Sequence, residues 1–214
     1  MSRAVVVYVH GLWLRGHEGF LLRRRLGAAL GAEARSFDYS SFRANLAENA
    51  TALYRNLRSL EADTLHLVAH SLGGLVVLEA FERGADGLPP GRIVLLGSPV
   101  RGCRAARRLV ALPLGRTLLG HSAEALVTSR DRRWEGARDL GVIAGDLPVG
   151  IGRLMGPMGA PNDGTVLVSE TDLPGAKQQL RLRVSHSGMP FSTEVARRTA
   201  QFLREGRFDQ SGDR

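Results

Sequence analysis

The sequence predicts an α/β fold in which one mostly parallel sheet is covered by helices on both faces. Two observations carry this prediction. Short β-rich runs alternate with stretches of helical periodicity, and no linker-like or repeated segment interrupts them. At 214 residues the chain is long enough to bury one sizeable core, so we expect a single domain over residues 1–214.

About six strands and four longer helices are expected. The strand candidates are short, mostly β-rich runs at 4–9, 32–39, 64–69, 92–97, 140–145 and 179–185. The helix candidates carry apolar residues three and four positions apart and span 19–30, 45–60, 72–81 and 193–203. Helices between strands imply parallel crossovers, and ligands of such sheets bind at the carboxyl ends of the strands.

Charge and cysteine content narrow the classes of partner. The formal net charge is +8, and all but one of the 29 basic residues are arginines dispersed along the chain. Because aromatic residues are few, we expect no nucleic-acid partner, whereas anionic lipids or substrates fit the charge. The single cysteine, Cys103, cannot form an internal disulfide and has no neighbouring ligand cluster, so neither a metal nor a cofactor is expected.

The apolar runs are all short. None approaches the roughly 18 residues of a membrane span, and AVVVYV (4–9) is too short for a signal-peptide core. We therefore expect no transmembrane segment and a cytoplasmic location.

VAHSLGGL (68–75) places Ser71 between an expected strand and an expected helix. A strand that enters a helix through a very tight turn pushes the turn side chain out over the sheet edge, and its near neighbours must be small. Ala69, Gly73 and Gly74 meet that requirement. An N-cap role for the serine is the alternative, but a cap needs no such small neighbours. The motif predicts that Ser71 is a nucleophile.

Later residues supply candidates for a base and an acid, which a serine nucleophile requires. In this architecture the order along the chain is Ser, then Asp or Glu, then His. Of the two later histidines, His121 lies in the irregular middle of the chain and His186 directly follows the last expected strand, so His186 is the predicted base. Asp163, in an Asn-Asp-Gly sequence that is also a plain turn signal, is the predicted acid. Asp146 is its competitor, disfavoured by Pro148 two residues on.

Backbone N–H groups are the third requirement, because a carbonyl that becomes tetrahedral carries negative charge. Leu72 follows the nucleophile at the start of a helix and supplies one donor. YVHGLW (8–13) ends the first expected strand, and Gly11 lets the backbone turn inward there. The N–H of Leu12 is therefore the second predicted donor, with an ordinary glycine turn as the alternative.

The motifs VHGLW, AHSLGG, LLGSPVRG, NDGTV and SHSGM span nearly the whole chain, and together they resemble the α/β-hydrolase superfamily. Within it the chain is similar to small bacterial lipases and esterases. These include the Bacillus type, which has alanine as the first small residue of the tight turn, or elbow, around the serine, as Ala69 is here. The resemblance implies an α/β-hydrolase fold that lacks the first two strands of the full fold. It also implies a triad and two oxyanion donors: Ser71, Asp163, His186, Leu12 and Leu72.

Ester hydrolysis through an acyl-enzyme, with a small-molecule ester or lipid as substrate and no cofactor, is the activity that this resemblance implies. Two alternatives stay open. An acyltransferase or thioesterase would use the same triad with another acceptor or another acyl donor. A non-catalytic member of the fold would bind a lipid or a partner, although such a module has no need of an intact triad.

Substrate preference is expected to come from residues 100–138, which follow LLGSP. Residues 103–119 combine an apolar stripe with arginines, and Pro113 divides them into two pieces. Two interpretations compete: a flap that rests on an anionic lipid surface, or a solvated helix packed over the sheet.

A second apolar stretch, residues 146–161, precedes the predicted acid. It contains Met155 and Met158, whose flexible side chains are predicted to line an acyl pocket. Trp13 is predicted to wall the same pocket. The alternatives are a long irregular loop for the stretch and simple packing for the tryptophan.

Overall fold

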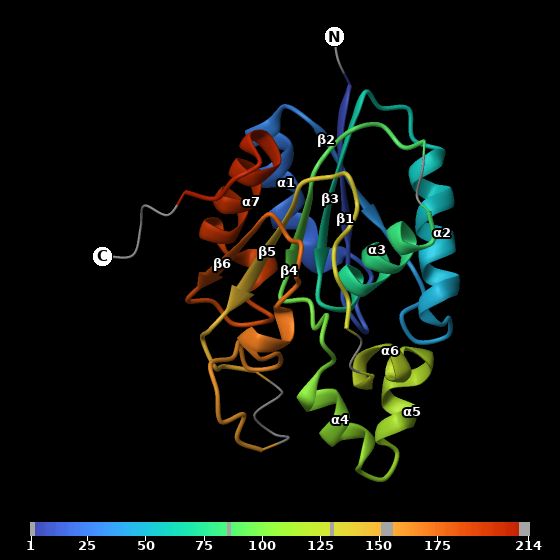
Figure 1. The fold of residues 1–214 in the computed structure, drawn as a ribbon, viewed down its shortest axis with the longest axis vertical. Coiled ribbons are helices and arrows are strands. Elements are labelled where there is room, and N and C mark those ends of the chain that lie inside the picture. The colour runs from blue at the N-terminus through green and yellow to red at the C-terminus, as the bar shows by residue number, and fades with distance from the viewer. Residues whose placement is uncertain (1–2, 85–86, 129–130, 151–155, 210–214) are drawn as a thin grey trace.

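The computed structural model describes residues 3–84, 87–128, 131–150 and 156–209. They form a six-stranded sheet in the order β2-β1-β3-β4-β5-β6, and every neighbouring pair is parallel (Figure 1). The predicted α/β architecture is confirmed. The strands are β1 (Ala4–Val9), β2 (Glu33–Phe37), β3 (Thr64–His70), β4 (Ile93–Leu96), β5 (Leu140–Gly145) and β6 (Gln178–Leu182).

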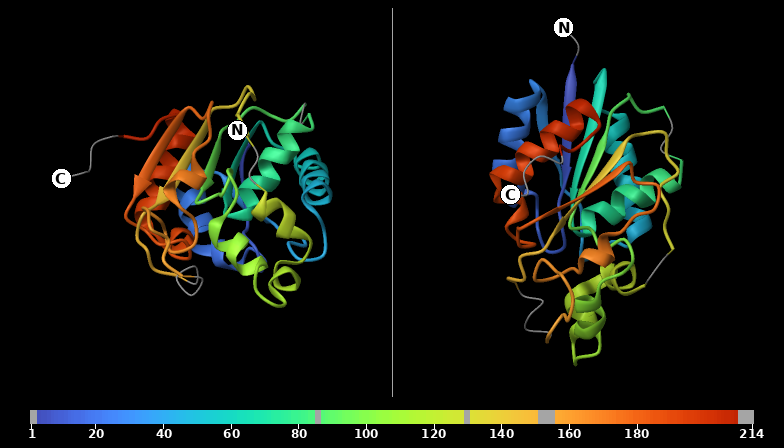
Figure 2. Two further views of the ribbon diagram at one scale, coloured as in Figure 1. Left: turned by 60° about the horizontal axis from the view of Figure 1, so that its bottom comes forward. Right: turned by 60° about the vertical axis from the view of Figure 1, so that its left-hand side comes forward.

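Four long helices cover the two faces of this sheet. Figure 2 shows α1 (Phe20–Leu30) and α7 (Thr193–Glu205) on one side and α2 (Leu46–Arg58) and α3 (Leu72–Glu82) on the other. The side chains of β1 alternate between the two resulting cores: Val5, Val7 and Val9 join the cluster under α2 and α3, and Val6 and Tyr8 join the cluster under α1 and α7. A strand buried on both faces explains the uninterrupted apolar run AVVVYV.

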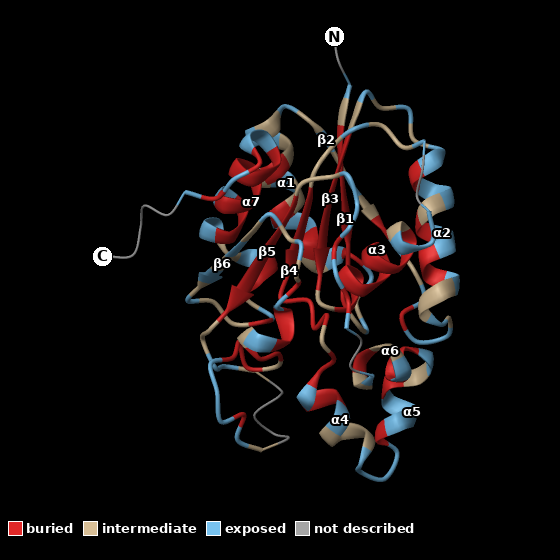
Figure 3. Ribbon diagram, viewed as in Figure 1, coloured by how far each residue is buried: buried red, intermediate tan, exposed pale blue. Residues whose placement is uncertain are grey.

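The edge strands differ from the central ones. β2 and β6 alternate between more and less exposed residues, whereas the residues of β4 and β5 are all buried (Figure 3). β6 also ends earlier than the predicted run, at Leu182. Beyond it the chain meets the loop that follows β5, where the N–H of His186 donates to the carbonyl of Asp163 at 2.8 Å.

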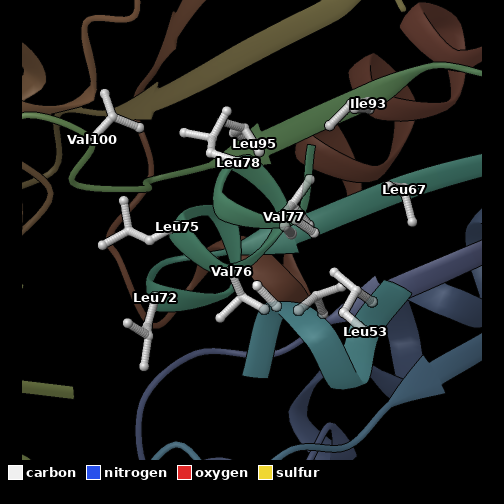
Figure 4. Close-up of a cluster of buried hydrophobic side chains, with 14 of the residues drawn as sticks. Leu53, Leu67, Leu72, Leu75, Val76, Val77, Leu78, Ile93, Leu95 and Val100 are labelled. Atoms are coloured by element: carbon white, nitrogen blue, oxygen red, sulfur yellow. The ribbon is translucent and has the colours of Figure 1, made fainter. Parts of the chain in front are cut away.

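α3 is the central helix and directly follows β3. Its residues from Leu72 to Ala80 are all buried, and Figure 4 shows its leucines and valines between Leu53 of α2 and the strand side chains. A helix that is apolar on nearly all sides belongs in such a position. The α3 side of the junction between β3 and α3 is thereby fixed by the core.

Three short helices lie beyond the carboxyl ends of the strands, at the bottom of Figure 1. They are α4 (Arg104–Val110), α5 (Gly115–Leu119) and α6 (Ala123–Val127), with the 3-10 turn η2 (Gly120–Ser122) between the last two. We call residues 104–127 the cap segment. Further 3-10 turns are η1 (His17–Gly19), η4 (Val168–Thr171) and η5 (Met189–Phe191). No helix in the described ranges has both the length and the apolar character needed to span a bilayer.

Candidate active site

Ser71 occupies the turn between β3 and α3 with φ 54° and ψ −123°. A non-glycine residue in this region is strained, and such strain persists only where surrounding structure holds it. A β-carbon at Gly73 would collide with the backbone carbonyls of Val9 and His10, and one at Gly74 would collide with Ser98. These close approaches explain the glycines after the serine. The Ser71 hydroxyl makes no capping hydrogen bond to α3, so its position is not that of a simple N-cap.

His186 joins Ser71 to Asp163. Its Nε2 lies 3.0 Å from the Ser71 Oγ, and its Nδ1 lies 2.7 Å from the Asp163 Oδ2. A carboxylate only accepts, so the imidazole proton lies on Nδ1 and Nε2 is free to accept from the serine hydroxyl. The structure thus brings together three residues 115 and 23 positions apart in sequence.

The turn around Asp163 fixes the direction of its carboxylate. Oδ1 accepts from the N–H groups of Thr165 at 2.9 Å and Val166 at 2.7 Å, which leaves Oδ2 for the histidine. Gly164 has φ +92°, a conformation that favours glycine. Asn-Asp-Gly is therefore a turn and a functional candidate at once. The competing candidate, Asp146, instead accepts from Arg181 at 2.7 Å.

His70, directly before the nucleophile, packs against His186. The ring centroids are 4.8 Å apart, and the His70 Nε2 lies 3.1 Å from the carbonyl oxygen of His186, to which it donates. Burial, and secondly the nearby His186, lower the pKa of His70 to about 3, so this ring is neutral at ordinary pH. Nothing near His70 in sequence indicates this contact, because its partner lies 116 residues further along the chain.

The loop after β1 approaches Ser71 closely. A β-carbon at Gly11 would lie 3.2 Å from the Ser71 β-carbon. A glycine at this position therefore lets the loop lie close to Ser71. His10 and Tyr39 brace this loop. The His10 Nδ1 donates to the Gly11 carbonyl at 2.8 Å, its Nε2 accepts from the Tyr39 N–H at 3.2 Å, and the rings stack at 4.2 Å.

Both proposed oxyanion donors lie at this loop and elbow. Leu72 is the first residue of α3, and the first N–H groups of a helix have no acceptor within the helix. Leu12 follows Gly11 and lines the same cavity as Ser71. The bracing by His10 and Tyr39 was missed at the sequence level, because their sequence separation of 29 residues gives no local signal.

An apolar cavity of about 440 Å³ opens beside Ser71. Its apolar wall comes from the loop after β1 and from the cap segment: Leu12, Trp13, Leu14, Ala105, Ala106, Leu109, Leu118, Leu119 and Leu126. Trp13 is thus one of the side chains around this cavity. Met158 is buried and is not among the residues that line this cavity; its carbonyl accepts from Arg104. Met155 lies outside the described residues.

Cys103 also lines the cavity, but burial raises the pKa of its thiol to about 12. The thiolate is therefore scarce at neutral pH.

A larger hollow of about 810 Å³ lies at the amino end of β3, remote from Ser71, and is lined by residues that include His66, Arg92 and Arg138. Among the described residues, no group of three or more His, Cys, Asp or Glu side chains is placed to hold a metal ion.

Comparison with known proteins agrees with this architecture. Among solved structures, the mature lipase BlEst2 of Bacillus licheniformis is 19% identical, with a TM-score of 0.76 over 95% of this chain and 91% of that one. The metagenomic carboxyl esterase MGS0156 is 18% identical, with a TM-score of 0.63 over 88% and 66%. At these identities the likeness establishes the fold.

A third structure is similar over part of its length. Phospholipase PlaB of Legionella pneumophila is 20% identical, with a TM-score of 0.61 over 79% of this chain and 44% of that one. No curated protein matches the chain by sequence. A family model described as the alpha/beta hydrolase family matches residues 6–207, nearly the entire chain. The chain therefore belongs to the alpha/beta hydrolase family.

Proposed function

We propose that this protein hydrolyses carboxylic esters through an acyl-enzyme on Ser71. The observation that carries the proposal is the hydrogen-bonded series from Ser71 through His186 to Asp163, placed beside an apolar cavity. A nucleophile, a base and an orienting acid within hydrogen-bond distance are the arrangement that acyl transfer needs. Two of the structural neighbours, a lipase and a carboxyl esterase, support an ester as the substrate class.

In the acylation step the Ser71 Oγ attacks the ester carbonyl carbon while its proton passes to the His186 Nε2. The oxygen of the tetrahedral intermediate accepts from the N–H groups of Leu12 and Leu72, and each such donor typically accelerates the reaction by about 10²–10³. The C–O bond to the alcohol then breaks, and the alcohol leaves with the proton from His186. Asp163 holds the imidazole in orientation and stabilises its positive charge.

In the deacylation step water replaces the alcohol. His186 takes a proton from the water as its oxygen attacks the acyl carbon, and the second tetrahedral intermediate uses the same two N–H donors. The bond to the Ser71 Oγ breaks and the serine recovers the proton from His186. The products are a carboxylic acid and the free enzyme.

The acyl group of the substrate occupies the cavity, whose walls include Trp13 and four leucines of the cap segment, Leu109, Leu118, Leu119 and Leu126. Each methylene that moves from water into an apolar site contributes about 0.8 kcal/mol to binding. Among acyl chains that fit the cavity, a longer chain is therefore bound more tightly. Ala105 and Ala106 leave room on the α4 side of the cavity. We infer a preference for acyl chains longer than acetyl.

A chain-length series of p-nitrophenyl esters tests the proposal, with Ser71→Ala as the control for background hydrolysis. We expect kcat/KM to rise from acetate to longer acyl chains, and Ala106→Leu to move the optimum toward shorter chains because it fills the cavity. If no ester in the series is hydrolysed faster by the parent protein than by Ser71→Ala, the proposed function is wrong.

A further inference from the structure

The arginine side chains of α4 contact other segments of the protein. Arg104 donates to the carbonyl of Met158 at 2.9 Å, Arg108 donates to that of Pro157 at 2.9 Å, and Arg107 lies 3.5 Å from the carboxylate of Glu170. These side chains attach the cap segment to η4 and to the loop before it. The sequence-based interpretation that this cluster faces a lipid surface is therefore not favoured, and α4 is a packed helix.

A different part of the cap segment exposes large apolar side chains. Leu112 is 51% exposed, Leu114 is 76% exposed and Leu118 is 52% exposed, although such side chains are usually buried. Figure 3 shows how much of α5 is exposed at this end of the molecule. Trp13 and Phe42, from two loops at the carboxyl ends of the strands, are also about half exposed, at 53% and 45%.

Hydrogen bonds connect Trp13 and Phe42 to the cap segment near the cavity entrance. The Trp13 Nε1 donates to the carbonyl of Leu118 at 2.8 Å, and the carbonyl of Phe42 accepts from the N–H of His121 at 3.0 Å. Trp13 and Leu118 also line the cavity at Ser71. The exposed apolar surface therefore continues into the proposed acyl site.

Two arginine side chains lie next to these apolar residues. Arg43 and Arg116 are exposed and line a shallow hollow together with Phe42 and His121. Within the described ranges, neither guanidinium has a carboxylate at ion-pair distance. Residues 104–127 contain one acidic residue, Glu124, so the local charge is positive. Apolar side chains flanked by unpaired arginines match the interface of an anionic bilayer.

We propose that this surface docks on anionic lipid and delivers ester groups from it to Ser71, an inference that rests on the proposed ester hydrolysis. The docking surface consists of Trp13, Phe42, Arg43, Leu112, Leu114, Arg116 and Leu118. The leucines and Phe42 enter the acyl region, Trp13 lies at the headgroup level, and the arginines pair with phosphates. Docking places the cavity entrance against the lipid, so the acyl chain leaves the bilayer without crossing water.

Vesicle co-sedimentation tests docking separately from catalysis. Every variant carries Ser71→Ala, so that no lipid is consumed, and the vesicles are phosphatidylcholine with or without phosphatidylglycerol. We expect binding only with phosphatidylglycerol, and a loss of roughly five-fold in partition coefficient for each of Arg43→Gln and Arg116→Gln. The loss should shrink as salt is raised, since exposed charges are screened.

A second pair of variants tests the apolar part. Leu114 has φ 63°, a left-handed conformation that asparagine tolerates well, so Leu114→Asn removes the apolar side chain without straining the turn. We expect Leu114→Asn with Leu112→Gln to weaken vesicle binding several-fold.

The matched control for the arginine variants is Arg24→Gln with Arg55→Gln. It removes two exposed charges from α1 and α2 and should leave vesicle binding unchanged.

The outcomes are decisive in both directions. Absence of vesicle binding, equal binding to both vesicle types, or an equal loss in the α1 and α2 control would overturn the docking proposal. Hydrolysis of short soluble p-nitrophenyl esters, measured without the Ser71→Ala change, should be the same in the docking variants and the parent. If the protein hydrolyses soluble esters but does not bind vesicles, only the docking proposal is wrong. If it hydrolyses no ester at all, the proposed function is wrong.

Discussion

The backbone N–H of Arg104 donates to the Glu170 Oε1 at 2.5 Å, while the other carboxylate oxygen accepts from the N–H of Leu167 at 2.9 Å. Arg104 begins α4, and Leu167 ends the turn that contains Asp163. One buried carboxylate therefore ties the cap segment to the loop of the proposed acid. Burial raises the pKa of Glu170, which agrees with its enclosed position.

Glu170→Ala should loosen both attachments at once. A buried N–H left without an acceptor costs about 1–3 kcal/mol, and here two are affected. We expect a lower free energy of unfolding in urea and a higher KM for long-chain esters, because the cap segment forms the cavity wall. Glu170→Gln keeps one acceptor oxygen and should fall between the parent and Glu170→Ala. The control is Glu124→Gln on the exposed side of the cap; a Glu170→Ala protein with parental stability and KM would refute the role of this link.

Asp163 and Asp146 can be separated by matched amide substitutions. Asp163→Asn should lower kcat by roughly 10⁴, since the amide no longer holds His186 with its proton on Nδ1. Asp146→Asn disturbs only the ion pair with Arg181 and should leave kcat near the parent value. The reverse pattern in steady-state kinetics would assign the acid to Asp146.

His66 should make the fold sensitive to acid. Burial, with help from Arg92 and Arg138, lowers the pKa of His66 from 6.5 to about 4, and its Nδ1 accepts from the Arg92 N–H. The unfolded chain therefore binds a proton at a higher pH than the folded chain. The contribution is fully present above pH 6.5 and is lost as the pH falls from there toward 4, by at most about 3 kcal/mol.

His66→Asn keeps an acceptor for the Arg92 N–H but cannot titrate. Urea unfolding between pH 7 and pH 4.5 should show a shallower loss of stability in this variant than in the parent. The comparison needs no activity measurement, since His66 lies at the amino end of β3, away from Ser71. Parallel pH profiles for the two proteins would show that this histidine does not contribute.

The fold was predictable because its signals are local. β1, β3 and β5 are apolar runs of the right length, and the small residues around Ser71 directly reflect a tight junction between a strand and a helix. The order of Ser71, Asp163 and His186 along the chain followed from the same architecture, and the structure places the three in contact.

The rest depends on contacts between distant segments. Tyr39 supports His10, and Glu170 accepts from Arg104, yet nothing near these residues in sequence announces either contact. The arginines of α4 looked free in sequence because the carbonyls that they meet are backbone groups of a remote loop. The position of Met158 likewise depends on where that loop packs, since its carbonyl accepts from Arg104.

We propose that Ser71 forms a covalent acyl-enzyme with help from His186. The most direct measurement is mass spectrometry of the protein after treatment with a p-nitrophenyl alkylphosphonate, which leaves a stable adduct on an activated serine. We expect one equivalent of adduct on the peptide that contains Ser71, and none in Ser71→Ala or His186→Ala. An adduct on another residue, or full labelling of Ser71 in His186→Ala, would contradict the mechanism.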